Sequence, residues 1–236
     1  MGDSEASDEE VRLQRLFKAA EGLDLILIGG QSTALWASAY GLRQVTTKDL
    51  DWQGTPEDAE TYAQRLGLKL LRNNGMDGHF GIILVPVEGA ESFVVDFLTS
   101  SLGVSAHQLR ERARVATALG TSFRVMHPVH LVISRCVNLV DAARASRRVS
   151  DLAQARTSIT SCEAFLHANA DADARLTRKM VKALLEFCRR IEAKRCWQEH
   201  AVDAFDSVRP WISMDADFRE RTYPKWRLEV DRRFGK

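Results

Sequence analysis

The pattern of hydrophobic and polar positions changes along the chain. Near the N-terminus, residues 9–21 place apolar side chains at Val11, Leu13, Leu16 and Phe17 with charged residues between them, which is typical of an amphipathic helix. Short apolar runs follow, separated by polar and turn-rich segments, and such runs favour buried strands. The expected strands are residues 25–28, 48–53, 68–72, 80–85, 93–98, 114–118 and 123–126, and the expected helices between them are residues 32–40 and 56–66.

From Pro128 onward, the pattern predicts helices alone. Strands that alternate with helices indicate a small mixed α/β sheet, so the expected fold class is α/β + α. We predict an α/β domain over residues 1–126 and a helical C-terminal domain over residues 127–236. The expected helices of the second domain are residues 129–142, 146–168, 175–195, 197–207 and 215–231.

The composition is typical of a soluble globular protein. Its 236 residues are 45% hydrophobic, which is enough to bury a sizeable core, and no apolar stretch approaches the roughly 18 residues that span a bilayer. The first ten residues contain five acids and no base, unlike a secretory signal, and we expect residues 1–8 to form a disordered acidic tail. The four cysteines form no Cys-x-x-Cys pair, so we expect free thiols in a reducing cytoplasm.

The net charge of +1 conceals a polarity between the two parts of the chain. Residues 1–103 contain 16 acids and 8 bases, a net of −8, whereas residues 104–236 contain 16 acids and 25 bases, a net of +9. A half that carries carboxylates joined to a basic half suits a metal-dependent enzyme that acts on a polyanion, although two ordinary surfaces can also differ in this way.

Three aspartates are the strongest candidates for chemistry. Asp49 and Asp51 are separated by one residue on an expected strand, so both carboxylates lie on the same face and suit Mg²⁺. Asp96 lies inside the apolar run FVVDFL, where an unpaired carboxylate is costly and a cation or partner is expected. Gly29-Gly30 ends the first apolar run before a helix, and glycine backbone at a helix N-terminus suits a phosphate.

In this order, Gly29-Gly30, the TTKDLDW string around Asp49 and Asp51, and Asp96 resemble the nucleotidyltransferase superfamily of DNA polymerase beta. The TTKDLDW string is most similar to the corresponding string in the nucleotidyltransferase toxins of type IV toxin–antitoxin, or abortive-infection, systems. The resemblance implies that residues 1–126 form the nucleotidyltransferase domain and that three aspartates hold two Mg²⁺ ions beside a nucleoside triphosphate. It makes Asp49, Asp51 and Asp96 the metal ligands, and Gly29, Gly30 and Ser32 the residues that hold the triphosphate.

A second string extends the resemblance. In the toxins, a Pro opens a helix that carries a basic residue, and a later helix offers a basic-x-x-Asp-Leu string; Pro128, Arg135 and Asp151 fit that order. By resemblance, Arg135 contacts the triphosphate and Asp151 supports the site. The family's basic residue is usually Lys, and an acid often follows the later basic residue, where this chain has Val149-Ser150. Alternatively, Asp151 only pairs with Arg147 or Arg148 on one helix.

A polynucleotide partner is suggested by the basic residues. Eight arginines lie within residues 104–148, and residues 175–195 add eight bases against two acids. Such a basic stripe, here residues 175–195, can bind along a phosphate backbone. The solvent-facing side of an ordinary soluble helix can have the same composition.

The function expected from these features is Mg²⁺-dependent transfer of a nucleoside monophosphate to a hydroxyl of RNA, such as tRNA, or of a protein. A toxin of this type would also have an antitoxin protein as its partner. Two alternatives remain open: a small-molecule nucleotidyltransferase of the aminoglycoside type, and a non-catalytic binding protein that retains the fold. The departures at Arg135 and at Val149-Ser150 keep the second of these open.

Overall fold

The computed structural model describes residues 7–43, 47, 49–73, 78–89, 91–170, 172, 174–209 and 215–236. It divides into two compact units. The first consists of Met1–Ser32, Thr46–Ser101 and Ser105–His127, and the second of Thr33–Val45, Leu102–Val104 and Pro128–Lys236. The second unit therefore contains two short segments from the first half of the chain.

A mixed sheet forms the centre of the first unit, as the sequence predicted. Its order among the described residues is β3-β4-β5-β2-β1-β7-β6. The pairs β2–β5 and β1–β7 are parallel, and the other neighbours are antiparallel. The strands are β1 (Ile26–Ile28), β2 (Asp49–Gln53), β3 (Leu71–Arg72), β4 (His79–Val85), β5 (Phe93–Leu98), β6 (Arg114–Ala118) and β7 (Thr121–Val125).

Helices α1 and α3 of the first unit are among those that begin with a side-chain cap. In α1 (Asp8–Ala20), Ser7 and Glu10 form a capping box. In α3 (Pro56–Leu66), the Thr55 side chain accepts a hydrogen bond from the Asp58 amide, and the helix ends at Gly67 in a left-handed conformation. The other helices that begin in this unit are α2 (Gly29–Ala39) and α4 (Ala106–Arg112), and the sequence analysis did not predict α4.

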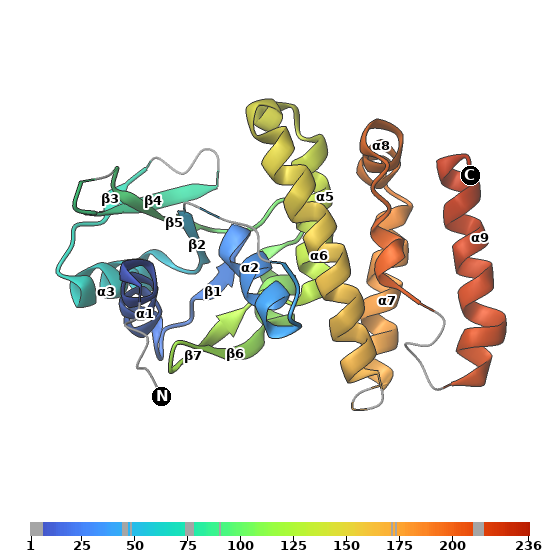
Figure 1. Cartoon of the computed structure of the whole chain (residues 1–236), viewed down its shortest axis with the longest axis horizontal. Helices are drawn as coiled ribbons and strands as arrows, with labels where there is room; N and C mark the ends of the chain where they lie inside the picture. The colour runs from blue at the N-terminus through green and yellow to red at the C-terminus, as the bar shows by residue number, and fades with distance from the viewer. Residues whose placement is uncertain are drawn as a thin grey trace. The chain divides into compact units, whose positions relative to one another are not determined.

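Helices α1 and α3 lie against the sheet (Figure 1), and their aromatic side chains pack with those of one face of the sheet. Trp52 of β2 is fully buried, with its ring centroid 6.5 Å from that of Phe17 on α1 and 6.1 Å from that of Tyr62 on α3. The ring centroid of Tyr62 in turn lies 5.5 Å from that of Phe97 on β5. Because side chains alternate across a strand, residues next to Trp52 and Phe97 must point to the opposite face, and these include Asp51 and Asp96.

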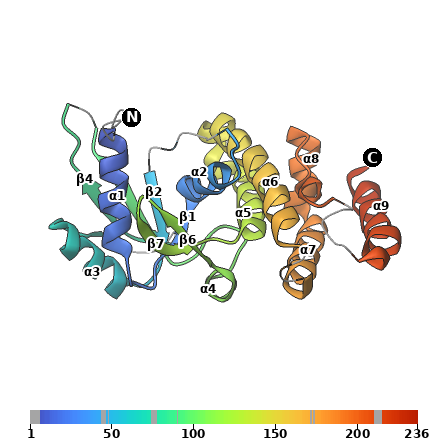
Figure 2. The same cartoon turned by 60° about the horizontal axis from the view of Figure 1, so that its bottom comes forward.

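The second unit is helical (Figure 2), and α5 is its most buried long helix. Nearly every side chain of α5 is buried, because α6, α7 and α8 all contact it. No helix among the described residues is both long and apolar enough to span a bilayer. The segments are α5 (Pro128–Val140), η1 (Ala142–Arg147), α6 (Arg148–Asn169), α7 (Ala174–Cys188), α8 (Ile191–His200), η2 (Ala204–Ser207), the π-helical η3 (Phe218–Thr222) and α9 (Tyr223–Phe234).

The prediction of continuous helices over residues 175–195 and 197–207 was wrong. Helix α7 ends at Cys188, Arg190 is extended with φ −82° and ψ 158°, and α8 begins at Ile191. A continuous helix over residues 175–195 would put Ile191 on its apolar face, but 62% of Ile191 is exposed. The break lets α8 pack on α5, where the Cys196 thiol donates a hydrogen bond to the Cys136 carbonyl at 3.0 Å. Tertiary packing therefore overrides the helical periodicity here.

Candidate metal centre

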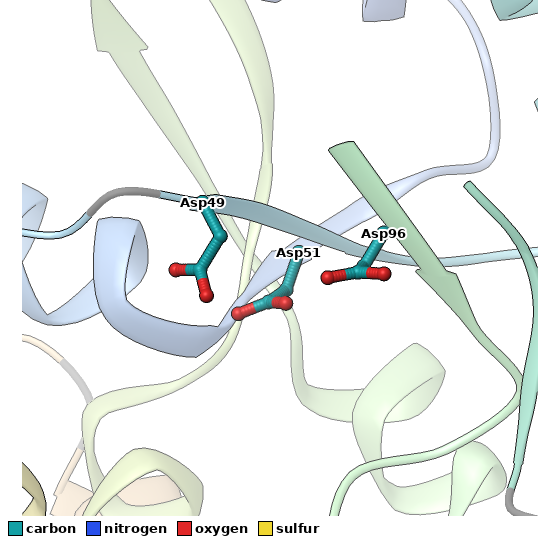
Figure 3. Close-up of side chains that lie close together, drawn as sticks. All are labelled: Asp49, Asp51 and Asp96. Atoms are coloured by element: carbon teal, nitrogen blue, oxygen red, sulfur yellow. The ribbon is translucent and has the colours of Figure 1, made fainter. Parts of the chain in front are cut away.

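Asp49, Asp51 and Asp96 converge on one face of two neighbouring strands (Figure 3). Strands β2 and β5 run parallel with Asp51 directly opposite Asp96, and Asp49 lies two residues before Asp51 on the same face. One oxygen from each carboxylate lies within 4.8 Å of those from the other two. The sequence could place Asp49 and Asp51 side by side, but only the strand order brings Asp96 to them.

The geometry and chemistry of these oxygens fit Mg²⁺. All three aspartates are half-buried, so their carboxylates remain accessible from solvent. Mg²⁺ takes oxygen ligands at about 2.0–2.1 Å, which puts two ligands on opposite sides of one ion roughly 4.2 Å apart. Adjacent ligands lie roughly 2.9 Å apart, so oxygens separated by up to 4.8 Å have to move closer together before all three bind one ion.

Asp51 is packed against the glycine bend. Ile28, the last residue of β1, is opposite Asp51 in the antiparallel pair, so Gly29 follows just beyond it. Gly29 has φ +70°, a conformation that L side chains rarely adopt. A Cβ atom at this position would lie 1.6 Å from Oδ2 of Asp51. The bend thus adjoins the aspartate cluster, in agreement with the order of the motif.

Two further residues of the bend are buried. Gly30 is the second residue of α2, and Ser32 is fully buried with its hydroxyl donating to the Gly29 carbonyl at 3.0 Å. This hydrogen bond holds the first turn of the helix. The role of Gly29, Gly30 and Ser32 toward a triphosphate remains a prediction.

Two side chains outside the predicted set contact the aspartates. The Thr47 hydroxyl donates a hydrogen bond to Oδ1 of Asp49 at 2.7 Å, and Nδ1 of His79 lies 3.7 Å from Oδ1 of Asp96. Thr47 belongs to the TTKDLDW string, so its nearness was readable from the sequence. His79 was not, because it reaches Asp96 only through the pairing of β4 with β5, at a register shift between His79 and Gly81.

Arg135 and Asp151 lie in the second unit. Arg135 is on α5 and Asp151 on α6, and both are almost completely buried. Two nitrogens of Arg144 contact the two oxygens of Asp151, Nε at 3.2 Å and Nη2 at 3.0 Å. The alternative that paired Asp151 with Arg147 or Arg148 therefore named the wrong arginine, because η1 turns Arg144 toward Asp151. The roles of Arg135 and Asp151 toward a nucleotide remain predictions.

Half of the basic residues within 175–195 are already paired with carboxylates. Arg189 contacts Glu186 and Glu229 at 2.8 and 2.7 Å, and these two bonds raise the pKa of its guanidinium. Arg190 contacts Glu192 at 2.6 Å and Arg195 contacts Glu199 at 2.6 Å, while Arg178 is paired with Asp215. These four of the eight bases are partly neutralised, so the stripe carries less free positive charge than the sequence suggested.

Comparisons with known proteins identify no family for this chain. No family model and no curated protein matches the chain. Among solved structures, an antigenic nucleotidyltransferase-like protein from Paracoccidioides brasiliensis is similar at 12% identity and a TM-score of 0.40, over 65% of this chain and 77% of that one. The JHP933 protein from Helicobacter pylori is similar at 13% identity and a TM-score of 0.41, over 97% of this chain and 93% of that one.

Proposed function

We propose that this protein is a Mg²⁺-dependent nucleotidyltransferase that transfers a nucleoside monophosphate from a nucleoside triphosphate to a hydroxyl acceptor. The observation that carries the proposal is the convergence of Asp49, Asp51 and Asp96 beside the bend at Gly29. Three clustered carboxylates with accessible oxygens form a site for divalent cations, and the resemblance of the sequence supplies the reaction class.

In this mechanism, Asp49, Asp51 and Asp96 hold the ions. When bound, Mg²⁺ neutralises the negative charge that develops on the attacking and leaving oxygens of an in-line displacement. Asp96 accepts the proton of the acceptor hydroxyl, whose oxygen then bonds to the α-phosphorus as pyrophosphate leaves. The bend at Gly29-Gly30 orients the triphosphate through backbone amides. The protein thus contributes chiefly by positioning its substrates.

An RNA acceptor such as tRNA is the finer part of the proposal, together with a protein acceptor as its variant. The support for RNA is the net charge of +9 over residues 104–236, a sum that already includes the acids paired with arginines of α7 and α8. A role as the toxin of a type IV toxin–antitoxin system, with an antitoxin protein as partner, rests on the resemblance of the TTKDLDW string.

The direct test incubates the protein with each α-³²P-labelled nucleoside triphosphate, Mg²⁺ and total RNA, and then separates labelled RNA and protein on gels. Label should be transferred by the native protein and by Glu57→Gln, whose exposed carboxylate lies on α3. Asp51→Asn, which keeps the shape of the side chain, should transfer none above background. Transfer that is undiminished in Asp51→Asn would contradict the proposal. Titration calorimetry that finds nucleotide binding independent of Mg²⁺, without any transfer, would instead support a non-catalytic binding protein.

A further inference from the structure

We propose that Gly29 and Thr47 are positioning residues that hold the carboxylates of Asp51 and Asp49 in place for metal binding. This inference rests on the proposed function, and it assigns Gly29 a role in addition to the contact with phosphate that its motif implies. Gly29 acts by leaving space, and Thr47 acts by donating a hydrogen bond.

The space beside Gly29 is already filled by Asp51. A Cβ atom built on Gly29 would lie 1.6 Å from Oδ2, 2.5 Å from Cγ and 2.7 Å from Cβ of Asp51. Real Cβ atoms essentially never approach other atoms closer than 3.0 Å. Because Cβ of Asp51 also clashes, rotation of the Asp51 side chain cannot relieve the overlap. An alanine at position 29 must therefore displace the backbone of β2 or that of the bend.

The pairing of the strands explains why this position has to be glycine. Ile28 is opposite Asp51 in the antiparallel pair of β1 and β2, and the chain leaves the strand at the next residue. Gly29 makes that departure with φ +70°, which turns the backbone across the side of β2 that carries the aspartates. The same residue thus ends the strand, begins α2 and borders the carboxylate of Asp51.

Thr47 acts on the neighbouring carboxylate. Its hydroxyl lies 2.7 Å from Oδ1 and 3.3 Å from the backbone carbonyl of Asp49. A hydrogen bond to one carboxylate oxygen restricts rotation of the Asp49 side chain and so fixes the direction in which the carboxylate is presented. Groups that orient metal ligands in this way typically change metal affinity by roughly 10–100-fold when they are removed.

Matched controls separate positioning from general strain. Gly67 ends α3 in the same unit with φ +68°, and nothing lies within 4 Å of the place where its Cβ would be. Gly67→Ala therefore imposes the left-handed backbone strain of Gly29→Ala without the contact with a carboxylate. For Thr47, Thr47→Val removes the hydroxyl at nearly constant shape, and Thr47→Ser retains it.

The experiment measures Mn²⁺ binding in the absence of nucleotide, by electron paramagnetic resonance of free Mn²⁺ and by calorimetry. We expect Gly29→Ala and Thr47→Val to weaken binding by about tenfold or more, whereas Gly67→Ala and Thr47→Ser bind as the native protein does. No Mn²⁺ binding by the native protein would overturn the proposed function and the positioning role with it. Equal affinities of the native protein, Gly29→Ala and Thr47→Val would overturn the positioning role alone.

A second measurement covers a Gly29→Ala protein too unstable for titration. The urea midpoint of unfolding is compared for Gly29→Ala in the native background and in an Asp51→Gly background, which removes all three atoms of the clash. The substitution should lower the midpoint substantially less in the Asp51→Gly background. An equal loss in both backgrounds would show that Gly29 is needed for its backbone conformation alone, and would overturn its role toward Asp51.

Discussion

The buried aspartates of the second unit and the aspartate cluster of the first unit differ in the charges that surround them. Asp151 is met by two nitrogens of Arg144, and Asp203, whose side chain is 0% exposed, is met by Arg227 and Lys236, each at 2.5 Å. In the first unit, three half-buried carboxylates instead approach one another to within 4.8 Å.

This difference distinguishes a structural from a functional use of the same side chain. A buried carboxylate that meets a guanidinium is compensated within the protein, and losing the partner is costly. Two like charges about 4 Å apart near a protein surface repel by roughly 4 kcal/mol, so a cation that joins the three carboxylates lowers their mutual repulsion. The first arrangement holds helices together, and the second is suited to a divalent ion.

The largest expected effect is on catalysis in the first unit. Asp51→Asn should reduce nucleotidyl transfer by about 10³-fold or more, equivalent to roughly 4 kcal/mol of transition-state stabilisation. Without Mg²⁺, its free energy of unfolding should equal or exceed that of the native protein, because the substitution removes repulsion. Initial rates and urea denaturation in EDTA provide the two measurements. A variant as destabilised as a core mutant would mean that Asp51 is structural.

Removing a positively charged side chain from the second unit should lower the stability of the protein. Arg144→Met leaves Asp151 buried without this guanidinium and should lower the free energy of unfolding by about 3–5 kcal/mol. Urea denaturation gives the value. Arg156→Met, at an exposed position on α6, is the control and should change stability by less than about 0.5 kcal/mol. Equal effects of the two substitutions would break the distinction between the units.

Divalent cations should stabilise the protein through the aspartate cluster. At a Mg²⁺ concentration about 100 times the Kd, linkage adds about 2.7 kcal/mol, which corresponds to a rise in Tm of roughly 5–10 °C for a chain of this size. Asp51→Asn should lose this shift. Differential scanning fluorimetry measures it, with KCl at matched ionic strength as the control. A shift that persists in Asp51→Asn would place the ion elsewhere.

The smallest expected effect is on the free energy of unfolding at high pH, and it comes from a buried thiol. Burial raises the pKa of the Cys162 thiol from 9.0 to about 12. The unfolded thiol therefore loses its proton first, so the contribution of Cys162 to stability is full below pH 9 and declines as the pH rises toward 12. The free energy of unfolding measured between pH 8 and 10.5 should fall less steeply in Cys162→Ala. Rapid alkylation of Cys162 in the native protein at pH 8 would contradict its burial.

The sequence predicted most elements where local chemistry decides them. The helix over residues 56–66 forms as predicted, and the alternation in FVVDFL and DLDW separates the aromatic core from the aspartates. Ser7, by contrast, was expected in a disordered tail and instead caps α1. Prediction failed where a distant contact decides, as at Arg190, where packing of α8 on α5 breaks a continuous apolar pattern. The short helix α4 and the turn η1 were missed because neither is long enough to show a helical period.

Within the site, the sequence by itself determined that Asp49 and Asp51 share a face, because side-chain alternation follows from the covalent geometry of an extended chain. Only the tertiary structure decided that Asp96 joins them, that Gly29 borders Asp51, and that Arg144 rather than a neighbouring arginine meets Asp151. These contacts depend on which strands and helices become neighbours. That choice is made by burial of side chains far apart in the chain, such as Phe17, Trp52 and Phe97, and no local pattern records it.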